Sequence, residues 1–225
     1  QIKQLDQTIK QINQMHSGLT LGIHSRLKST TEYIIKHTKV GNYNLNRQQI
    51  GANVGCQPFG GTGTSGSGPK VGGPWSIWAT CQNADPCKAH AIQPSASLNA
   101  LQLITDEWSH ASEALHLSEL IHDVASRTPI GTQLKLPSIT GESNTLHYRG
   151  LGRLSCIADE PALIFELICV ALLTGNIPVI RYLPSAWRKA LQNEVIEINT
   201  SPDLSQVDGI LCQRKNIASN PANPL

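Results

Sequence analysis

Apolar residues along the first 80 positions follow the helix period and the strand period in turn. A helix is predicted near the start, where apolar residues lie four and three positions apart. These residues are Leu5, Ile9 and Ile12. Residues 19–23 alternate as a strand does, and a second helix is predicted at Ser29, since Ser29 and Glu32 have the spacing of a capping box. With a short strand over 43–46, this part is α/β, but too short to close a sheet of its own.

The second half of the chain alternates between the same two periods. Apolar positions over 98–124 predict one long helix or two short ones. From Gly150 onward, short apolar segments alternate with helical ones. The predicted strands are 153–158, 177–180, 195–198 and 210–212, and the predicted helices are 160–174 and 185–193. Strands that alternate with helices indicate βαβ crossovers and a parallel sheet.

A change of composition divides the chain into parts. Residues 81–96 are rich in turn and linker residues, including an Asp-Pro and a Gln-Pro step. We therefore expect a first part over 1–80, a linker over 81–96 and a second α/β domain over 97–225. The Pro-rich end of the second domain is expected to form a loose tail.

Residues 50–74 are unusually rich in glycine. Nine of the chain's 18 glycines lie here, and glycine lets a backbone turn through positive φ or approach a ligand closely. A flexible tether would lack apolar anchors, yet this stretch contains Val54, Phe59 and Val71. Two interpretations stay open: a folded loop that presents backbone N–H groups to a small ligand, or a plain structural connection.

The composition argues against several classes of protein. With 15% charged residues, a net charge of +2 and no basic run, the 225 residues lack the basic surface typical of nucleic-acid binding. No apolar run is long enough to span a membrane. The six cysteines and eight histidines show neither metal-ligand spacing nor a disulfide framework, which favours a reducing cytoplasm. Cys156 and Cys169 lie in apolar runs and are expected to be buried thiols.

Three motifs for nucleotide binding or catalysis are incomplete. Gly63–Lys70 looks like a phosphate-binding loop, but Pro69 interrupts it and Val71 stands where a magnesium-binding hydroxyl is needed. The turn after the strand at 153–158 lacks the glycines that let a pyrophosphate approach a helix N-terminus. Cys56 has no neighbouring cation or helix start that would activate a thiolate, so it is interpreted as a small packed side chain.

Several segments carry a family resemblance. The segments are Gly18–Arg26, Val40–Asn42, Asn46–Arg47, Ile50–Ala52, Gln57–Gly61, Ser65–Gly66, Gly68–Lys70 and Gly72–Pro74. Together they resemble the closing part of an aldehyde dehydrogenase, in the L-glutamate γ-semialdehyde (1-pyrroline-5-carboxylate) dehydrogenase form carried by bifunctional proline utilization A proteins. Pro129–Thr132, Thr140–Asn144 and Thr174–Asn176 resemble the extra C-terminal domain of longer members. The resemblance implies a partial aldehyde dehydrogenase catalytic domain over 1–80 and an incomplete, non-catalytic Rossmann-like domain over 97–225.

The resemblance also implies a role for the glycine-rich stretch. In the family, an anchor loop holds the α-carboxylate of the aldehyde substrate through backbone N–H groups, which here are those of Gly51 and Ala52, and Phe59 packs on its aliphatic part. The nucleophilic cysteine, the general-base glutamate and the NAD site lie on earlier segments in the family. No catalytic, cofactor-binding or metal-binding residue is therefore expected in this chain. NAD belongs to the complete enzyme and FAD to its proline dehydrogenase module, and neither is expected on this chain alone.

The expected function is part of a proline-catabolic enzyme that oxidises glutamate semialdehyde to glutamate with NAD. This piece would supply the anchor loop and a structural lid domain, and the isolated chain is expected to be inactive. Since a helical pattern starts near Gln1 without a Met before it, a fragment of a longer chain is expected.

The expected partners are glutamate semialdehyde and the N-terminal modules of the same enzyme, which would form homo-oligomers when complete. The expected location is the cytoplasm, with peripheral membrane association as an option for the full enzyme. The alternatives are a non-catalytic docking or oligomerisation module, and an inactive remnant.

Overall fold

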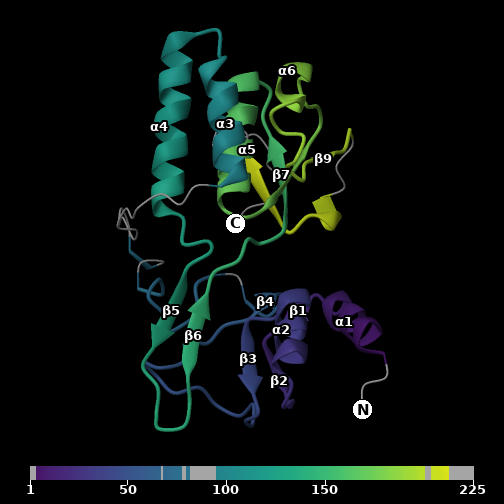
Figure 1. Cartoon of the computed structure of the whole chain (residues 1–225), viewed down its shortest axis with the longest axis vertical. Coiled ribbons are helices and arrows are strands. Elements are labelled where there is room, and N and C mark those ends of the chain that lie inside the picture. The colour runs from purple at the N-terminus through teal and green to yellow at the C-terminus, as the bar shows by residue number, and fades with distance from the viewer. Residues whose placement is uncertain (1–3, 67, 78–79, 82–94, 201–203, 213–225) are drawn as a thin grey trace, which may run out of the picture. The chain divides into compact units, whose positions relative to one another are not determined.

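The computed structural model describes residues 4–66, 68–77, 80–81, 95–200 and 204–212 (Figure 1). It contains helices and strands, which confirms the expected α/β class. The chain divides into two compact units, Gln1–Pro86 with Gln133–Leu146, and Cys87–Thr132 with His147–Leu225. Residues 133–146 were expected in the second domain, but they group with the first unit. The expected linker over 81–96 lies mostly outside the described residues.

The first unit consists of short elements joined by loops. Its elements are α1 (Leu5–Gln14), β1 (Ser17–Gly18), β2 (Thr20–Ile23), α2 (Lys28–His37), β3 (Asn42–Leu45), β4 (Thr62–Gly63), β5 (Gln133–Leu136) and β6 (Asn144–His147). Three two-stranded sheets pair β1 with β4, β2 with β3, and β5 with β6. β2 and β3 run parallel, with Thr20 opposite Asn42 and Ile23 opposite Leu45. The sequence patterns predicted both helices and the β2 and β3 strands, but not β1, β4, β5 or β6.

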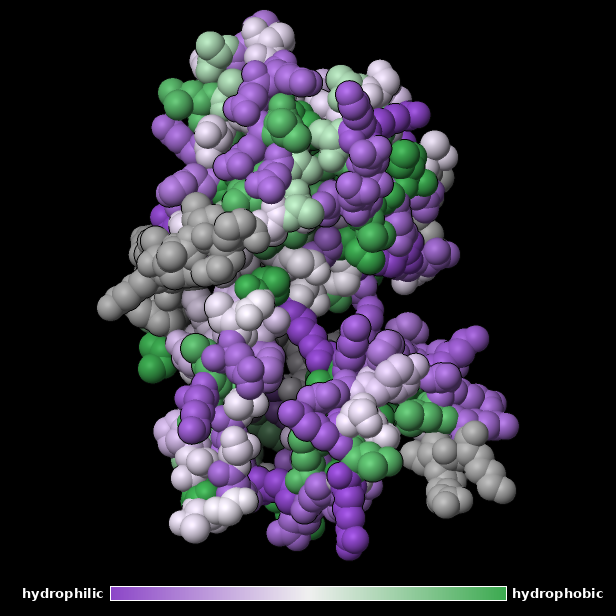
Figure 2. Space-filling view, in the orientation of Figure 1, coloured by the Kyte–Doolittle hydropathy of each residue, from purple (hydrophilic) through white to green (hydrophobic). Residues whose placement is uncertain are grey.

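The core of the first unit is small. Its buried residues come from α1, β2 and α2 and are Ile9, Ile23 and Ile34. The face of the molecule seen in Figure 2 is mainly hydrophilic, with separate hydrophobic patches. Exposed apolar side chains of this unit include Met15, Leu27, Ile50, Val54, Val71 and Ile77. Two parallel strands bury little surface by themselves, which agrees with the expectation that this part is too short to close a sheet of its own.

Helix α2 begins before the predicted capping box. Its N-cap is Leu27, and Ser29 lies inside the first turn, where its side chain cannot cap the helix. Ser25 instead holds the turn that precedes the helix. Its Oγ accepts a hydrogen bond from the Leu27 N–H at 3.1 Å, and its own N–H donates to Asn46 Oδ1 at 2.9 Å. The capping-box prediction was wrong because this turn fixes the start of the helix ahead of Ser29.

The second unit is built around one parallel sheet. Its elements are α3 (Ala96–Asp106), α4 (Ala111–Arg127), β7 (Arg153–Ile157), α5 (Pro161–Leu173), β8 (Ile177–Ile180), α6 (Ser185–Arg188), β9 (Glu197–Ile198), η2 (Leu204–Gln206) and β10 (Gly209–Cys212). The strand order is β10-β7-β8-β9, and every neighbouring pair is parallel. The predicted parallel sheet is confirmed, and the apolar stretch over 98–124 forms two helices. None of the described helices is both long and apolar enough to cross a membrane.

The core of the second unit lies between its helices and the sheet. Side chains from α3, α4 and α5 are almost fully buried there, and they include Leu101, Leu117, Ile121, Phe165 and Ile168. Cys156 on β7 and Cys169 on α5 are buried, as predicted. Burial raises the pKa of the Cys156 thiol to about 12 and raises the pKa of Cys169 as well. Both thiols therefore stay protonated at neutral pH, which rules them out as nucleophiles in this environment.

Candidate functional site

The glycine-rich stretch after β3 is a folded loop fastened at several points. Phe59 and Val71 exchange two backbone hydrogen bonds of 3.0 Å, and β4 pairs with β1, with Gly18 opposite Thr62. One close approach requires a glycine: a Cβ on Gly41 would lie 2.2 Å from the Gly60 carbonyl oxygen. The loop backbone thus packs directly against the chain entering β3, which no larger residue would allow.

Lys70 clamps this loop to the entrance of β3. Its Nζ donates hydrogen bonds to the Gly41 carbonyl, to Asn42 Oδ1 at 2.7 Å and to the Gly60 carbonyl at 2.9 Å. Asn42 Nδ2 adds a bond of 3.0 Å to the same Gly60 carbonyl. Burial of the ammonium lowers the pKa of Lys70 to about 8. Lys70 ends the incomplete phosphate-loop motif and belongs to a segment that carries the family resemblance, and its surroundings give it a structural role.

Replacing Lys70 by methionine is expected to lower the stability of the first unit by about 2 kcal/mol, because three acceptors would lose their donor. Amide hydrogen exchange in β2 and β3 measures this change. The folded pKa lies below the ordinary value of 10.5, so the unfolded chain holds more protons between these two pH values. The stability contributed by Lys70 therefore rises with pH across that window.

The control for this experiment is Lys36→Met, because Lys36 is exposed on α2. We expect the stability difference between the native chain and Lys70→Met to be larger at pH 10 than at pH 7. Two results would contradict the structural role of Lys70. One is an equal loss of stability in Lys70→Met and Lys36→Met, and the other is a stability difference between the native chain and Lys70→Met that becomes smaller as the pH rises.

Gly51 and Ala52, two of the residues selected from the sequence, lie at the exposed start of the loop. Gly51 has a φ of +76°, a conformation that favours glycine. Within the described part of the chain, the N–H groups of Gly51 and Ala52 donate to no protein acceptor. Two adjacent N–H groups are thus open to a ligand at this point of the backbone.

Phe59, the third selected residue, is exposed, with 38% of its surface accessible. It lies further along the same loop, in the pairing with Val71. Neither of the two cavities described below is lined by Gly51, Ala52 or Phe59. The structure therefore places all three residues on one loop without enclosing a pocket between them.

The turn after Ala52 is held by a network of side chains. The N–H groups of Cys56 and Gln57 donate to the Asn53 carbonyl at 3.1 and 2.9 Å. Gln57 Oε1 accepts from the Asn53 N–H at 3.0 Å, and Gln57 Nε2 donates to Glu142 Oε2 at 3.3 Å. Sequence reasoning missed the contact with Glu142, which lies 85 positions further along the chain and leaves no signal in local spacing.

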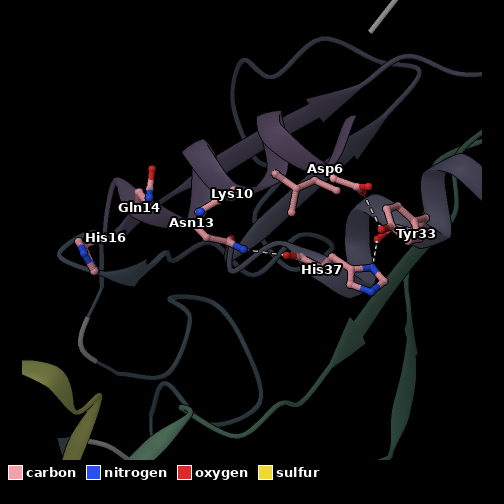
Figure 3. A pocket seen from close by; sticks show the side chains of 8 residues that line it. Asp6, Lys10, Asn13, Gln14, His16, Tyr33 and His37 are labelled. Atoms are coloured by element: carbon pink, nitrogen blue, oxygen red, sulfur yellow. Dashed lines mark hydrogen bonds between the residues drawn. The ribbon is translucent and has the colours of Figure 1, made fainter. Parts of the chain in front are cut away.

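A cavity of about 460 Å³ lies between α1 and α2 (Figure 3). Several of its polar groups bond to one another: the Tyr33 hydroxyl donates to Asp6 Oδ1 at 2.7 Å, and Asn13 Nδ2 donates to the His37 carbonyl at 2.8 Å. The bond to the Asp6 carboxylate raises the pKa of Tyr33. These contacts join the two helices, so we assign the cavity a structural role. In the described ranges, no three His, Cys, Asp or Glu side chains are grouped so that they could hold a metal ion.

A smaller cavity of about 180 Å³ lies at the carboxyl ends of β7 and β8 in the second unit. Ligands of parallel sheets bind at this edge. Here Asp159 and Arg181 both line the cavity, and Glu160 is the N-cap of α5. Two carboxylates therefore lie next to the helix start at which a pyrophosphate would bind. This helix start is less favourable for a pyrophosphate than a glycine-rich turn, and the absence of a cofactor on this chain stays a prediction.

The known proteins that are similar to this chain are aldehyde dehydrogenases and PutA proteins. Residues 1–84 match the model of the aldehyde dehydrogenase family. The bifunctional protein PutA of Rhizobium meliloti is 35% identical over 174 residues, which cover 76% of this chain and 14% of that protein. The 1-pyrroline-5-carboxylate dehydrogenase of Geobacillus sp. strain WCH70 is 40% identical over 72 residues, which cover 32% of this chain and 14% of the enzyme. The chain thus spans about one seventh of the length of these relatives.

A solved structure supports the fold over most of the chain. The structure of proline utilization A from Corynebacterium freiburgense matches with a TM-score of 0.59 and 23% identity, over 93% of this chain and 22% of that one. At this identity, the likeness is informative about the fold alone.

Proposed function

Because residues 1–84 match the aldehyde dehydrogenase family model and the chain is similar to PutA proteins, we propose that it forms part of a proline-catabolic aldehyde dehydrogenase. Its substrate would be L-glutamate γ-semialdehyde, which the complete enzyme oxidises to glutamate with NAD. Within that enzyme, the loop at Gly51 and Ala52 binds the substrate's α-carboxylate. The second unit serves as a structural lid domain.

The observation that carries this proposal is the pair of open N–H groups at Gly51 and Ala52. A carboxylate accepts charge-assisted hydrogen bonds from backbone N–H groups. The positive φ of Gly51 turns the backbone there, and a Cβ at this residue would meet no atom within 4 Å, so the space beside the glycine is free. Phe59, with part of its ring exposed, contacts the aliphatic part of the substrate in this proposal.

The chain's contribution is to bind and orient the substrate, because binding at the carboxylate places the distant aldehyde carbon for reaction. NAD supplies the hydride acceptor when bound to the complete enzyme. The carboxylates of Asp159 and Glu160 at the start of α5 are unfavourable for a dinucleotide phosphate. FAD belongs to the proline dehydrogenase module in this proposal.

A second candidate function is a non-catalytic docking or oligomerisation module. The exposed apolar side chains of the first unit, among them Leu27, Ile50 and Val54, favour association with further polypeptide. Binding of the chain to a dehydrogenase that already has its own anchor loop would support this second candidate.

The proposed function is tested by replacing the matching C-terminal segment of the Rhizobium meliloti PutA with this chain. We expect this chimaeric PutA to oxidise glutamate semialdehyde with NAD, and the isolated chain to show no turnover, because its matched region covers 14% of the related dehydrogenases. NADH absorbance reports the rate. Proline oxidation by the same chimaera serves as the control for folding.

Oxidation of glutamate semialdehyde by the isolated chain would contradict the proposal that this chain binds the substrate while other segments of the enzyme carry out the reaction. A chimaera that oxidises proline and binds NAD but does not oxidise the semialdehyde would contradict the anchor function, since both of its catalytic modules would then be folded.

A further inference from the structure

The segment between β5 and β6 reaches the candidate anchor loop within the first unit. Glu142 Oε2 accepts hydrogen bonds from Arg47 Nη1 at 3.2 Å and from Gln57 Nε2 at 3.3 Å. Asn144 Oδ1 accepts from the same Gln57 nitrogen at 3.3 Å, and Asn144 Nδ2 donates to the Pro137 carbonyl at 3.0 Å. One carboxylate thus accepts hydrogen bonds from two side chains that lie on either side of Gly51 in the sequence.

The other end of Gln57 controls the loop backbone. Its Oε1 accepts from the N–H of Asn53, the residue that follows Ala52. Since both ends of the Gln57 amide are engaged, the amide has one preferred orientation, with its oxygen toward Asn53 and its NH₂ group toward Glu142. The Asn53 N–H is therefore engaged, and the preceding N–H groups of Gly51 and Ala52 are left for a ligand.

Arg47 makes this arrangement compatible with an anionic ligand. The side chains of Arg47 and Glu142 are 26% and 28% exposed, so both charges are partly shielded from water and interact more strongly than on an open surface. A bare carboxylate near the loop would repel a bound carboxylate. Paired with the Arg47 guanidinium, Glu142 can orient Gln57 without adding net negative charge.

We propose that Glu142 is a positioning residue for the substrate loop. Through Gln57 it fixes the turn that begins at Asn53, and through Arg47 it keeps the surroundings electrically neutral. A residue outside the family-matched segment 1–84 thereby sets the shape of a loop inside that segment. The inference that the turn is positioned stands on the contacts alone, and its consequence for substrate rests on the proposed function.

The first test is amide hydrogen exchange of the full 225-residue chain. In Glu142→Ala, exchange at Asn53 is expected to become about tenfold faster, because Gln57 loses its charged acceptor and keeps only Asn144 Oδ1 as a partner for its NH₂ group. In Glu142→Gln, which keeps an acceptor oxygen but not the charge, the increase is expected to be smaller. Glu119→Gln, at an exposed position on α4, is the matched control and should leave Asn53 unchanged. Exchange in β2 and β3 reports that the unit stays folded.

The second test measures the kinetics of the chimaeric PutA defined above. Glu142→Ala is expected to raise the KM for glutamate semialdehyde about tenfold with kcat within about twofold, since substrate binding is weakened and the chemistry is not. Unchanged exchange at Asn53 would overturn the positioning role, whatever the kinetics. Faster exchange with an unchanged KM would uphold the positioning role and contradict the proposed function, so the two failures are distinguishable.

Discussion

Replacing Phe165 by alanine is expected to lower the free energy of unfolding of the second unit by about 3–5 kcal/mol, which is the range for a fully buried aromatic residue. Phe165 has no exposed surface. Its ring centroid lies 5.3 Å from that of Trp108 and 5.1 Å from that of Trp187. The change would open a cavity among α5, the end of α3 and α6, and it would remove two aromatic contacts that each contribute beyond area burial. Because domains are stable by about 5–15 kcal/mol, much of the second unit's stability would be lost.

Urea unfolding followed by tryptophan fluorescence measures this loss. The control is Leu103→Ala on α3, whose side chain is 58% exposed, and we expect it to cost less than about 0.5 kcal/mol. Phe165→Leu, which keeps most of the volume, should fall between the two. A cost below about 1 kcal/mol for Phe165→Ala would show that this aromatic cluster does not form the core.

Replacing Gly51 by valine in the chimaeric PutA is expected to lower kcat/KM for glutamate semialdehyde by about ten- to a hundredfold. The free energy behind this range is that of one charge-assisted hydrogen bond, about 1.5–3 kcal/mol. Gly51 adopts a φ of +76°, which a β-branched residue strongly disfavours. The backbone would therefore rotate, and the directions of the N–H groups of Gly51 and Ala52 would change.

The chain provides a matched control at Gly131, in the second unit. This glycine has a φ of +80°, and a Cβ added there would also meet no atom within 4 Å. Gly131→Val therefore imposes the same kind of backbone strain at a distance in sequence from the loop. We expect it to lower thermal stability but to leave kcat/KM within about twofold. An equal kinetic loss in both variants would mean that Gly51 acts through general stability and not through substrate binding.

Regular elements with strong periodicity were predictable from the sequence. Leu5, Ile9 and Ile12 marked α1, and the alternation of apolar strands with helices after Gly150 marked the parallel sheet of the second unit. Local sequence patterns gave a wrong prediction where a contact with another part of the chain fixes the start of a helix. The Ser29 capping box was displaced because the Ser25 turn already fixes the start of α2.

The contacts that shape the candidate site were not predictable from spacing. Glu142 meets Arg47 across 95 positions and Gln57 across 85, and the β5–β6 sheet that carries it was not predicted. The sequence pattern around Lys70 resembles a phosphate-binding loop, but in the structure its ammonium donates to backbone carbonyls. Only the resemblance selected Gly51, Ala52 and Phe59, because composition alone identifies the glycine-rich stretch and not the residues within it that face a ligand.

The most direct test of the account is a crystal structure of the chimaeric PutA with L-glutamate, the proposed product. The account predicts that the α-carboxylate of glutamate lies within about 2.7–3.1 Å of the backbone nitrogens of Gly51 and Ala52, with the aliphatic carbons against Phe59. Glutamate bound with its α-carboxylate elsewhere, while these two N–H groups bond to water or to protein, would contradict it.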